Sequence, residues 1–573
     1  MGKTKALLPL AALLLAACGQ LNLPGLQPKS FTLALNPASL SIAQGSSVTT
    51  ALTVTPQNGF TGTISLSLVG APSGVTLSPT GATVPGSGPV TQELTLSVDG
   101  SVAPGTYALR VRGTAGGYAQ EASLSLTVTL PFTLALDLPS PLQTVAPGGQ
   151  VQVPVQAKFN DPRVASVTLT VRLADPCAKG TSYCPGWDAS RYPGVVHPTR
   201  SYPLTPASPS ASLLFQVDPG APPQGPFKYE LVLSGQDASG NPQEEAVPFY
   251  LKVLRPGETS AMEYWNLWRD YMGYAPVQED PEWSFRAWLH GRYLAMNIDK
   301  DPFAHDEDLS YPFSSPEGKA AGARGNVGRR TVYIPRSSFP DFSSWPLESA
   351  MTNGFYAVPF HRLSLIAPDV TTGGFGLFRA ALDDPAYPSY WRLYSVSTQP
   401  VFRSGTRPTE DAQLFPVRDK TVPLNRMYGE RPPYNSPCQN PDKPASPPYL
   451  THQGLDWSRS PFGLALSVRL FAAQPTPTKV LEARLTRVSD NQEVPVCAYG
   501  SEQYWAPSDQ GGDLGNRLLA YDSAVFVVPR YPLDPGETYQ AEVRAVFGST
   551  EETFSWSFRV APQDGLFPLR LSP

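Results

Sequence analysis

The chain has 573 residues and a formal net charge of −5, with 16% charged residues, 64 Pro, 47 Gly and five Cys. This length indicates several domains, at roughly 150 residues for each. The mild acidity gives no reason to expect a nucleic-acid partner, which would call for a basic patch.

The amino terminus has a basic start followed by a short apolar run over residues 6–17. The run is shorter than the roughly 20 apolar residues of a spanning helix and predicts a secretory signal peptide over 1–17. The letters LAAC, which end at Cys18, resemble a bacterial lipobox. This resemblance implies a lipoprotein, exported and anchored by lipid on Cys18 to the cell membrane or the outer membrane, facing the periplasm or the exterior. Residues 18–30 are then a linker.

Apolar and polar residues alternate with period two along residues 31–130, and Gly, Pro or Asn ends each run. This pattern predicts the strands of a β-sandwich. The stretch APGTYALRV at 103–111 resembles the late strands of bacterial immunoglobulin-like surface modules. The opening FTLALNP at 31–37 returns as FTLALDLP at 132–139, which predicts a duplicated module over 131–254.

If the lipid uses Cys18, four cysteines remain, and an even number in an exported protein favours disulfides. We expect the pairs Cys177–Cys184 and Cys438–Cys497. Zinc is the alternative, but the C-x2-C spacing of structural zinc sites is absent.

Helical periodicity replaces alternation after residue 258. Trp265, Trp268 and Met272 follow one another at offsets of three and four and share a helical face. Asp280 is a suitable N-cap and Pro281 a suitable first residue for a second helix. We expect both helices, and His290 within the second, to pack on a core.

An ordered set of short motifs in this region resembles the CAP superfamily, which groups cysteine-rich secretory, antigen 5 and pathogenesis-related-1 proteins and is also called SCP-like. The motifs are Asn266, Arg269, Gly273, Pro276 and Val277, then His290 with Tyr293, then SPEG at 315–318, PFHR at 359–362 and GGFG at 373–376. The resemblance implies an α-β-α sandwich over 258–402. Alternation resumes and predicts a C-terminal β-sandwich over 410–562, so the expected fold is multidomain, with immunoglobulin-like β-sandwiches flanking one CAP-like domain.

The same resemblance implies a cleft lined by two histidines, the second of them on a strand, and two acids. His305 and His361 match the histidines. Neutral imidazoles suit Zn²⁺ as a weakly held ion, and no cofactor is required.

The sequence departs from the resemblance at the acids of this cleft. Gly325 stands where the resemblance expects a glutamate, and Glu317, Asp306 or Glu307 could enter the cleft instead. Glu348 is a candidate for the other acid. The run DED at 306–308 also fits a solvated turn.

Three functions remain open from the sequence. The first is a lipid-anchored surface protein whose head binds a ligand or a divalent cation. The alternatives are an envelope hydrolase resembling a metal-dependent peptidase, or a passive adhesin or structural surface protein. We expect a binding protein more than an enzyme, with the membrane and an envelope polymer, lipid or surface protein as partners.

Overall fold

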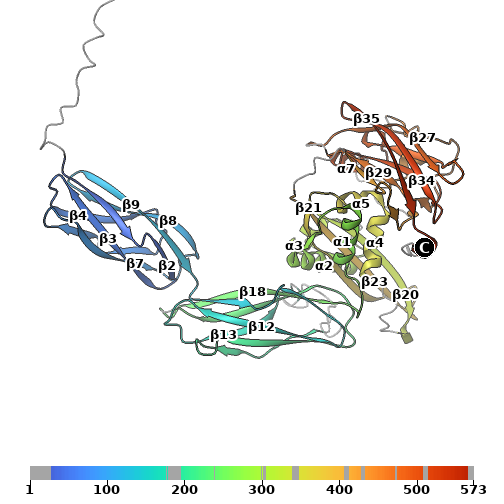
Figure 1. The fold of residues 1–573 in the computed structure, drawn as a ribbon. Helices are drawn as coiled ribbons and strands as arrows, with labels where there is room; N and C mark the ends of the chain where they lie inside the picture. The colour runs from blue at the N-terminus through green and yellow to red at the C-terminus, as the bar shows by residue number, and fades with distance from the viewer. Residues whose placement is uncertain are drawn as a thin grey trace, which may run out of the picture.

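The computed structural model describes residues 28–175, 177, 195–237, 239–298, 300, 305–338, 347–405, 412–427, 433–444, 446–471, 474–506 and 514–565. Cys18 and Cys184 lie outside these ranges. Three β-sandwiches follow one another, and most of the helices lie between the second and the third (Figure 1). None of the helices in the described ranges is both long and apolar enough to cross a bilayer.

The first sandwich has two sheets, in the orders β1-β3-β7-β5 and β2-β9-β8-β4-β6. Its strands are β1 (Ser30–Asn36), β2 (Ser39–Ala43), β3 (Ser47–Gln57), β4 (Gly62–Val69), β5 (Val75–Ser78), β6 (Gly81–Val84), β7 (Val90–Val98), β8 (Gly105–Ala115) and β9 (Tyr118–Thr129). Buried and exposed residues alternate along β3 and β8 because one face of each strand meets the other sheet.

The second sandwich repeats this arrangement strand for strand. Its sheets have the orders β10-β12-β16-β14 and β11-β18-β17-β13-β15, and β11 runs parallel to β18 as β2 does to β9. The strands are β10 (Phe132–Leu136), β11 (Leu142–Val145), β12 (Gln150–Phe159), β13 (Val167–Leu173), β14 (Val195–Val196), β15 (Tyr202–Leu204), β16 (Ser210–Val217), β17 (Phe227–Gln236) and β18 (Pro242–Val253). The prediction of β-sandwich modules is confirmed.

A polar contact joins the first two sandwiches. The Ser46 hydroxyl donates to Asp161 at 2.7 Å, and Arg163 donates both to Ser46 and to Asp161. A Cβ on Gly100 would lie 2.4 Å from a carboxylate oxygen of Asp237, so the two modules also approach closely at this glycine.

The helical region follows the second sandwich. Its helices are α1 (Ala261–Met272), α2 (Pro281–Met296), α3 (Pro316–Gly322), α4 (Glu348–Ala357) and α5 (Pro359–Leu365). Its strands are β19 (Gln278–Glu279), β20 (Gly325–Pro335), β21 (Val370–Gly373), β22 (Gly376–Asp383) and β23 (Tyr390–Arg403), and β22 and β20 both pair with β23.

Local sequence sets the limits of the first two helices. Ser260 and Glu263 form a capping box at the start of α1, and Gly273 ends it with φ of 81°, a left-handed conformation that glycine adopts without strain. Asp280 caps α2 by accepting from the backbone N–H groups of Glu282 and Trp283. Both helices were predicted.

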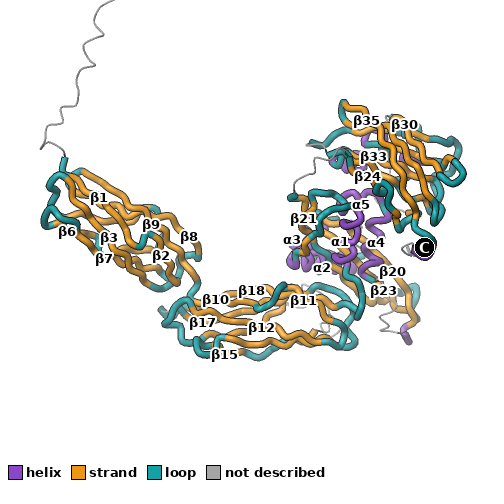
Figure 2. Tube along the Cα trace, in the orientation of Figure 1, coloured by secondary structure: helices purple, strands orange, loops and turns teal. Residues whose placement is uncertain are grey.

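Each face of the helical region is completed by a neighbouring sandwich (Figure 2). Trp288 of α2 packs edge-on against Phe227 of β17, with ring centroids 5.3 Å apart, inside one core that continues through β22 and β23. The other face, with α1 and α4, shares a second core with the C-terminal sandwich. The three parts therefore form one composite head.

The prediction of a self-contained α-β-α sandwich of the CAP superfamily over 258–402 is wrong. Strands make up 48% of the structure and helices 15%, so the chain is mostly β. The two large cores of the helical region are each shared with a sandwich, and the cluster of Ile334 and Leu393 within the region is small. The motif residues make local structural contacts instead. Asn266 donates to the carbonyl of Val277, and Arg269 donates to that of Ala275 and closes the end of α1.

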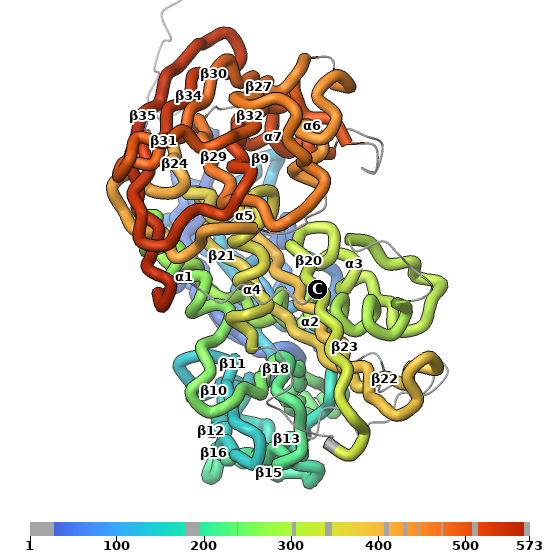
Figure 3. Tube along the Cα trace, turned by 90° about the vertical axis from the view of Figure 1, so that its right-hand side faces the viewer, coloured from blue at the N-terminus to red at the C-terminus, as the bar shows by residue number. Residues whose placement is uncertain are grey.

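The C-terminal sandwich has the sheet orders β24-β29-β33-β32-β27 and β25-β35-β34-β30-β31 and lies on the opposite side of the helices from the second sandwich (Figure 3). Its strands are β24 (Gln413–Phe415), β25 (Thr421–Val422), β27 (Tyr449–Leu450), β29 (Leu466–Arg469), β30 (Thr478–Arg487), β31 (Gln492–Glu493), β32 (Val496–Tyr499), β33 (Ala524–Pro529), β34 (Thr538–Phe547) and β35 (Thr550–Val560). β26 (Arg426–Met427) pairs with β28 (Phe462–Gly463), and α6 (Ser436–Gln439) and α7 (Leu514–Tyr521) lie in its connections.

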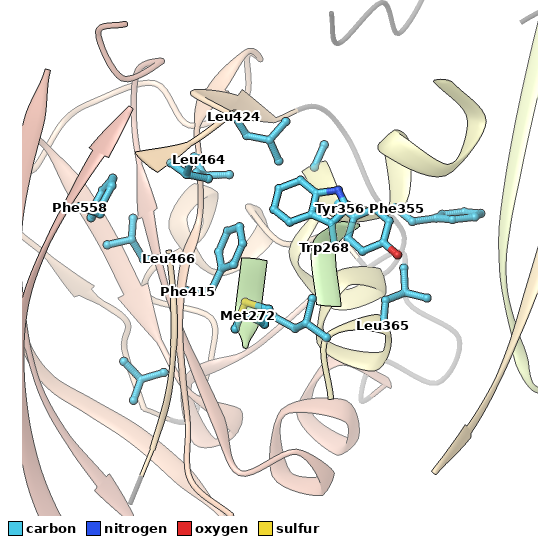
Figure 4. Packing of buried hydrophobic residues seen from close by; sticks show 14 of the residues in the cluster. Trp268, Met272, Phe355, Tyr356, Leu365, Phe415, Leu424, Leu464, Leu466 and Phe558 are labelled. Carbon is cyan, nitrogen blue, oxygen red and sulfur yellow. The ribbon is translucent and has the colours of Figure 1, made fainter. Parts of the chain in front are cut away.

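Aromatic rings make the joint between the helices and this sandwich (Figure 4). Trp268 and Tyr356 stack at 5.1 Å between ring centroids, and Trp268 also meets Phe415 at 6.0 Å. The guanidinium of Arg362 lies 3.9 Å from the centre of the Phe415 ring and donates to the carbonyl of Ala465 at 2.7 Å. The joint is thus both apolar and hydrogen-bonded.

Candidate functional site

Three histidines and one glutamate gather where α2, α3 and α5 approach one another. His290 and Glu307 are fully buried, and Nδ1 of His290 lies 2.9 Å from Oε1 of Glu307. The other oxygen of Glu307 accepts from the backbone N–H of Ser315 at 2.8 Å. Burial raises the pKa of Glu307, and the hydrogen bond from His290 opposes this.

This pair corrects two predictions. His290 is more than a packing residue, because it bonds the loop that precedes α3 to the middle of α2. In the DED run, Asp306 and Asp308 are exposed as a solvated turn would have them, but Glu307 between them is buried. The exposed Asp306 pairs with Lys319 at 2.8 Å.

Two glycines of α3 make room for the pair. A Cβ on Gly322 would lie 2.3 Å from Cε1 of His290, and a Cβ on Gly318 would lie 2.3 Å from Oε1 of Glu307. Neither position could carry a larger residue without moving the neighbouring His290 or Glu307 side chain. Gly318 belongs to the SPEG motif, whose serine, Ser315, caps α3 by accepting from the backbone of Gly318.

His305 and His361 approach each other from different elements. His305 is exposed in part, but its Nδ1 lies inward, 3.2 Å from the carbonyl oxygen of Gly322, and the partial removal of the ring from water lowers its pKa. His361 is partly buried on α5, where its ring meets Phe355 edge-on at 5.4 Å. Burial, and then the charge of His305, lowers the pKa of His361 to about 3. The expectation that the second histidine lies on a strand is wrong, since Pro359 starts a helix there.

Of the predicted acids, Glu307 joins the group through His290, whereas Glu317 and Glu348 do not. Glu317 is exposed in the first turn of α3. Glu348 is fully buried at the start of α4, where it accepts from the backbone N–H of Ala261 at 2.9 Å. At Gly325 a Cβ would lie 2.8 Å from Thr398, so a glutamate would not fit without rearrangement.

Within the described ranges, no group of three or more His, Cys, Asp or Glu side chains is arranged to hold a metal ion. Binding of one ion by His305 and His361 therefore stays a prediction. The buried His290–Glu307 pair fixes a loop, and the neutral His361 is placed to pack against Phe355.

A buried lysine, which sequence reasoning missed, lies where the second sandwich meets the helices. Nζ of Lys252, on β18, is 3.6 Å from Glu279 and 3.7 Å from Glu348, and all but 1% of the residue is buried. Burial lowers the pKa of Lys252, but the two carboxylates outweigh burial and the net direction is upward. Burial raises the pKa of Glu348. A lysine inside the apolar run VPFYLKVL was the available signal.

The disulfide Cys438–Cys497 is confirmed and joins α6 to β32. For Cys177–Cys184 the pairing stays a prediction, since Cys184 lies outside the described residues. The same holds for the lipid on Cys18.

No family model matches the chain, and no curated protein matches it. The CAP resemblance thus finds no support there. Among solved structures, the chain is similar to the D00-D0 domain of intimin, with 16% identity over 38% of this chain and 98% of that one and a TM-score of 0.17. The Yersinia pseudotuberculosis adhesin InvE gives 18% identity over 38% and 58%, with a TM-score of 0.14. Domains 4 and 5 of the S-layer protein SbsC give 21% over 18% and 54%, with a TM-score of 0.14. Likenesses this small say nothing about what the chain does.

Proposed function

We propose that this is an exported, lipid-anchored surface protein that acts by contact and not by catalysis. The first β-sandwich, together with the second sandwich that repeats its strand order and forms the base of the composite head, holds the rest of the head away from the membrane. The head presents a surface to other envelope components, as an adhesin or a structural protein does.

The repeated sandwich is the observation that carries this proposal. β1 to β9 and β10 to β18 have matching sheet orders and come, in chain order, between the predicted lipid site at Cys18 and the helical region. The polar contact of Ser46 with Asp161 and Arg163 limits bending between the modules. Such an array extends a head from its anchor, because each module contacts only its neighbours.

The arrangement of the titratable groups favours contact over catalysis. His290 and Glu307 satisfy each other in the interior, and burial keeps His361 neutral beside Phe355. A general base instead needs a pKa near the working pH and access to substrate. The hydrolase alternative gains no support from this geometry.

The experiment is fractionation of cells that produce the full chain, with protease added to intact cells. We expect the chain in the membrane fraction and digestion of the head from outside. Cys18→Ser should release the chain or block its processing, whereas Gly19→Ser should leave it anchored. A Cys18→Ser chain that remains as firmly bound as the parent contradicts the anchor, and a head protected in intact cells contradicts surface exposure.

A further inference from the structure

The outer end of the sheet in the helical region carries a group of exposed aromatic rings. Tyr333, Tyr387 and Tyr390 are 42%, 53% and 41% exposed, and Trp391 lies beside them at the start of β23. These four residues with Arg336 are called the aromatic tip. The turn between β22 and β23 that carries Tyr387 projects from the body of the molecule (Figure 3).

Ring contacts and a hydrogen bond restrict three rings of the aromatic tip, those of Tyr333, Tyr387 and Trp391. The rings of Tyr333 and Tyr387 lie 5.0 Å apart between centroids and are tilted by 58°, and the hydroxyl of Tyr333 donates to Asp384 at 2.8 Å. The guanidinium of Arg336 lies 4.0 Å from the centre of the Trp391 ring and donates to the carbonyl of Pro388 at 2.9 Å. Rings fixed before binding lose little conformational freedom when a partner arrives.

The strands that lead to the aromatic tip have a formal excess of positive charge. β20, β22, β23 and their adjoining turns include four arginines and two aspartates, with the first two of the arginines in the middle of β20: Arg329, Arg330, Arg336, Arg392, Asp383 and Asp384. Arg336 pairs with Asp383, and Arg392 lies 3.7 Å from Asp384. Arg329 is exposed, and it lies four residues before Tyr333 on the same face of β20, because side chains alternate along a strand. A partner with negative charge complements this surface.

The exposed rings also limit the kind of partner. Among the residues that the structure describes, the large exposed hydrophobic residues at this end of the sheet are tyrosines, which have a polar tip, whereas insertion into a lipid surface favours Leu, Phe and Trp. A sugar ring offers C–H groups to an aromatic face and hydroxyl groups to Asp384 and the tyrosine hydroxyls. A carboxylate on the sugar offers the planar acceptor that arginine binds with two parallel hydrogen bonds.

We propose that the aromatic tip binds an acidic polysaccharide, a chain of pyranose sugars that carry carboxylates. The sugar rings stack on Tyr387 and Tyr333, and the carboxylates meet Arg329 and its neighbours. This inference deepens the proposed function by naming the partner of the head. The inference and the proposed function can fail separately, because polysaccharide binding is measured on the purified chain, whereas anchoring and surface exposure are measured in cells.

The test is calorimetric titration of the full chain with two uronate polymers, polygalacturonate and alginate, and with neutral dextran. We expect binding of at least one uronate polymer, weakening as salt is added, and no binding of dextran. Tyr387→Ser should weaken binding by about tenfold, since an aromatic contact contributes on that order. Arg329→Gln should weaken binding and reduce its dependence on salt.

Tyr531→Ser is the matched control, because Tyr531 is 50% exposed and lies on the C-terminal sandwich. Circular dichroism should show an unchanged fold in each variant, since all three positions are exposed. The inference is overturned if neither uronate polymer binds, if dextran binds equally well, or if Tyr387→Ser binds as tightly as the Tyr531→Ser control.

Discussion

His361 should make the head lose stability as the pH falls. In the unfolded chain this histidine titrates near 6.5, and in the native head burial and the charge of His305 lower its pKa to about 3. Between these values the unfolded chain binds a proton that the native head does not bind. The free energy of unfolding therefore falls on acidification, by about 1.4 kcal/mol for each pH unit well below 6.5. The contribution of buried, neutral His361 to the stability of the head is fully present at neutral pH and is lost progressively as the pH approaches 3.

Between pH 7 and pH 5 this one group should lower the free energy of unfolding by about 2 kcal/mol, because the unfolded histidine is only beginning to take its proton at pH 7. His361→Gln removes the titrating group and should reduce the pH dependence by that amount, whatever it does to stability at pH 7. His305, whose pKa is also lowered, contributes in the same direction and remains in the variant.

Urea unfolding followed by tryptophan fluorescence is the suitable assay. All ten Trp residues lie beyond residue 186, so the first sandwich gives no signal. His452→Gln, in an exposed connection, is the control and should keep the parent's pH dependence. The reasoning is refuted if His361→Gln loses as much stability between pH 7 and pH 5 as the parent does.

Three further changes test the packing of the head. Lys252→Met leaves two carboxylates in the interior without their cation, so it should destabilise the head by about 3–5 kcal/mol in the same urea assay. Lys300→Met on an exposed turn should have little effect, and equal losses of stability in the two variants would contradict the role of the buried charges. Replacing both Cys438 and Cys497 by Ser should cost about 4 kcal/mol, because the disulfide closes a separation of 59 residues, and an unchanged urea midpoint would contradict this. Gly322→Ala should lower the melting temperature of the head, since its Cβ would meet the His290 ring at 2.3 Å. In the control Gly454→Ala, the open turn has space for the Cβ and the variant bears only the backbone strain of its positive φ. A larger drop in melting temperature for Gly454→Ala than for Gly322→Ala would contradict the close packing at Gly322.

The sandwiches were predictable because a strand buried on one face must alternate. In β8 every second residue is buried, at Leu109, Val111 and Gly113, and the alternation of residue types predicts this without any tertiary information. The start of α2 was predictable for a similar reason, since Asp280 and Pro281 act on their immediate neighbours.

The candidate site was only partly predictable. His305 and His361 do approach each other, but the sequence could not place Glu307, whose role depends on His290 seventeen residues earlier. Asp306, Glu307 and Asp308 look equivalent as letters. Only the packing of α3 against α2 decides which of them faces inward.

By itself the sequence determined the features that depend on neighbouring residues: the alternation of apolar and polar residues along the strands, the helix caps, and the Gly, Pro and Asn residues that end each run. The tertiary structure alone decided that the helical region shares its cores with two sandwiches, through contacts such as Trp288 with Phe227 and Trp268 with Phe415. An apolar helix face must be buried, but its pattern does not say against what, because the hydrophobic effect is non-directional. For this reason short motifs could suggest a separate α-β-α domain, whereas the burial of Lys252 between Glu279 and Glu348 joins that region to the sandwich before it.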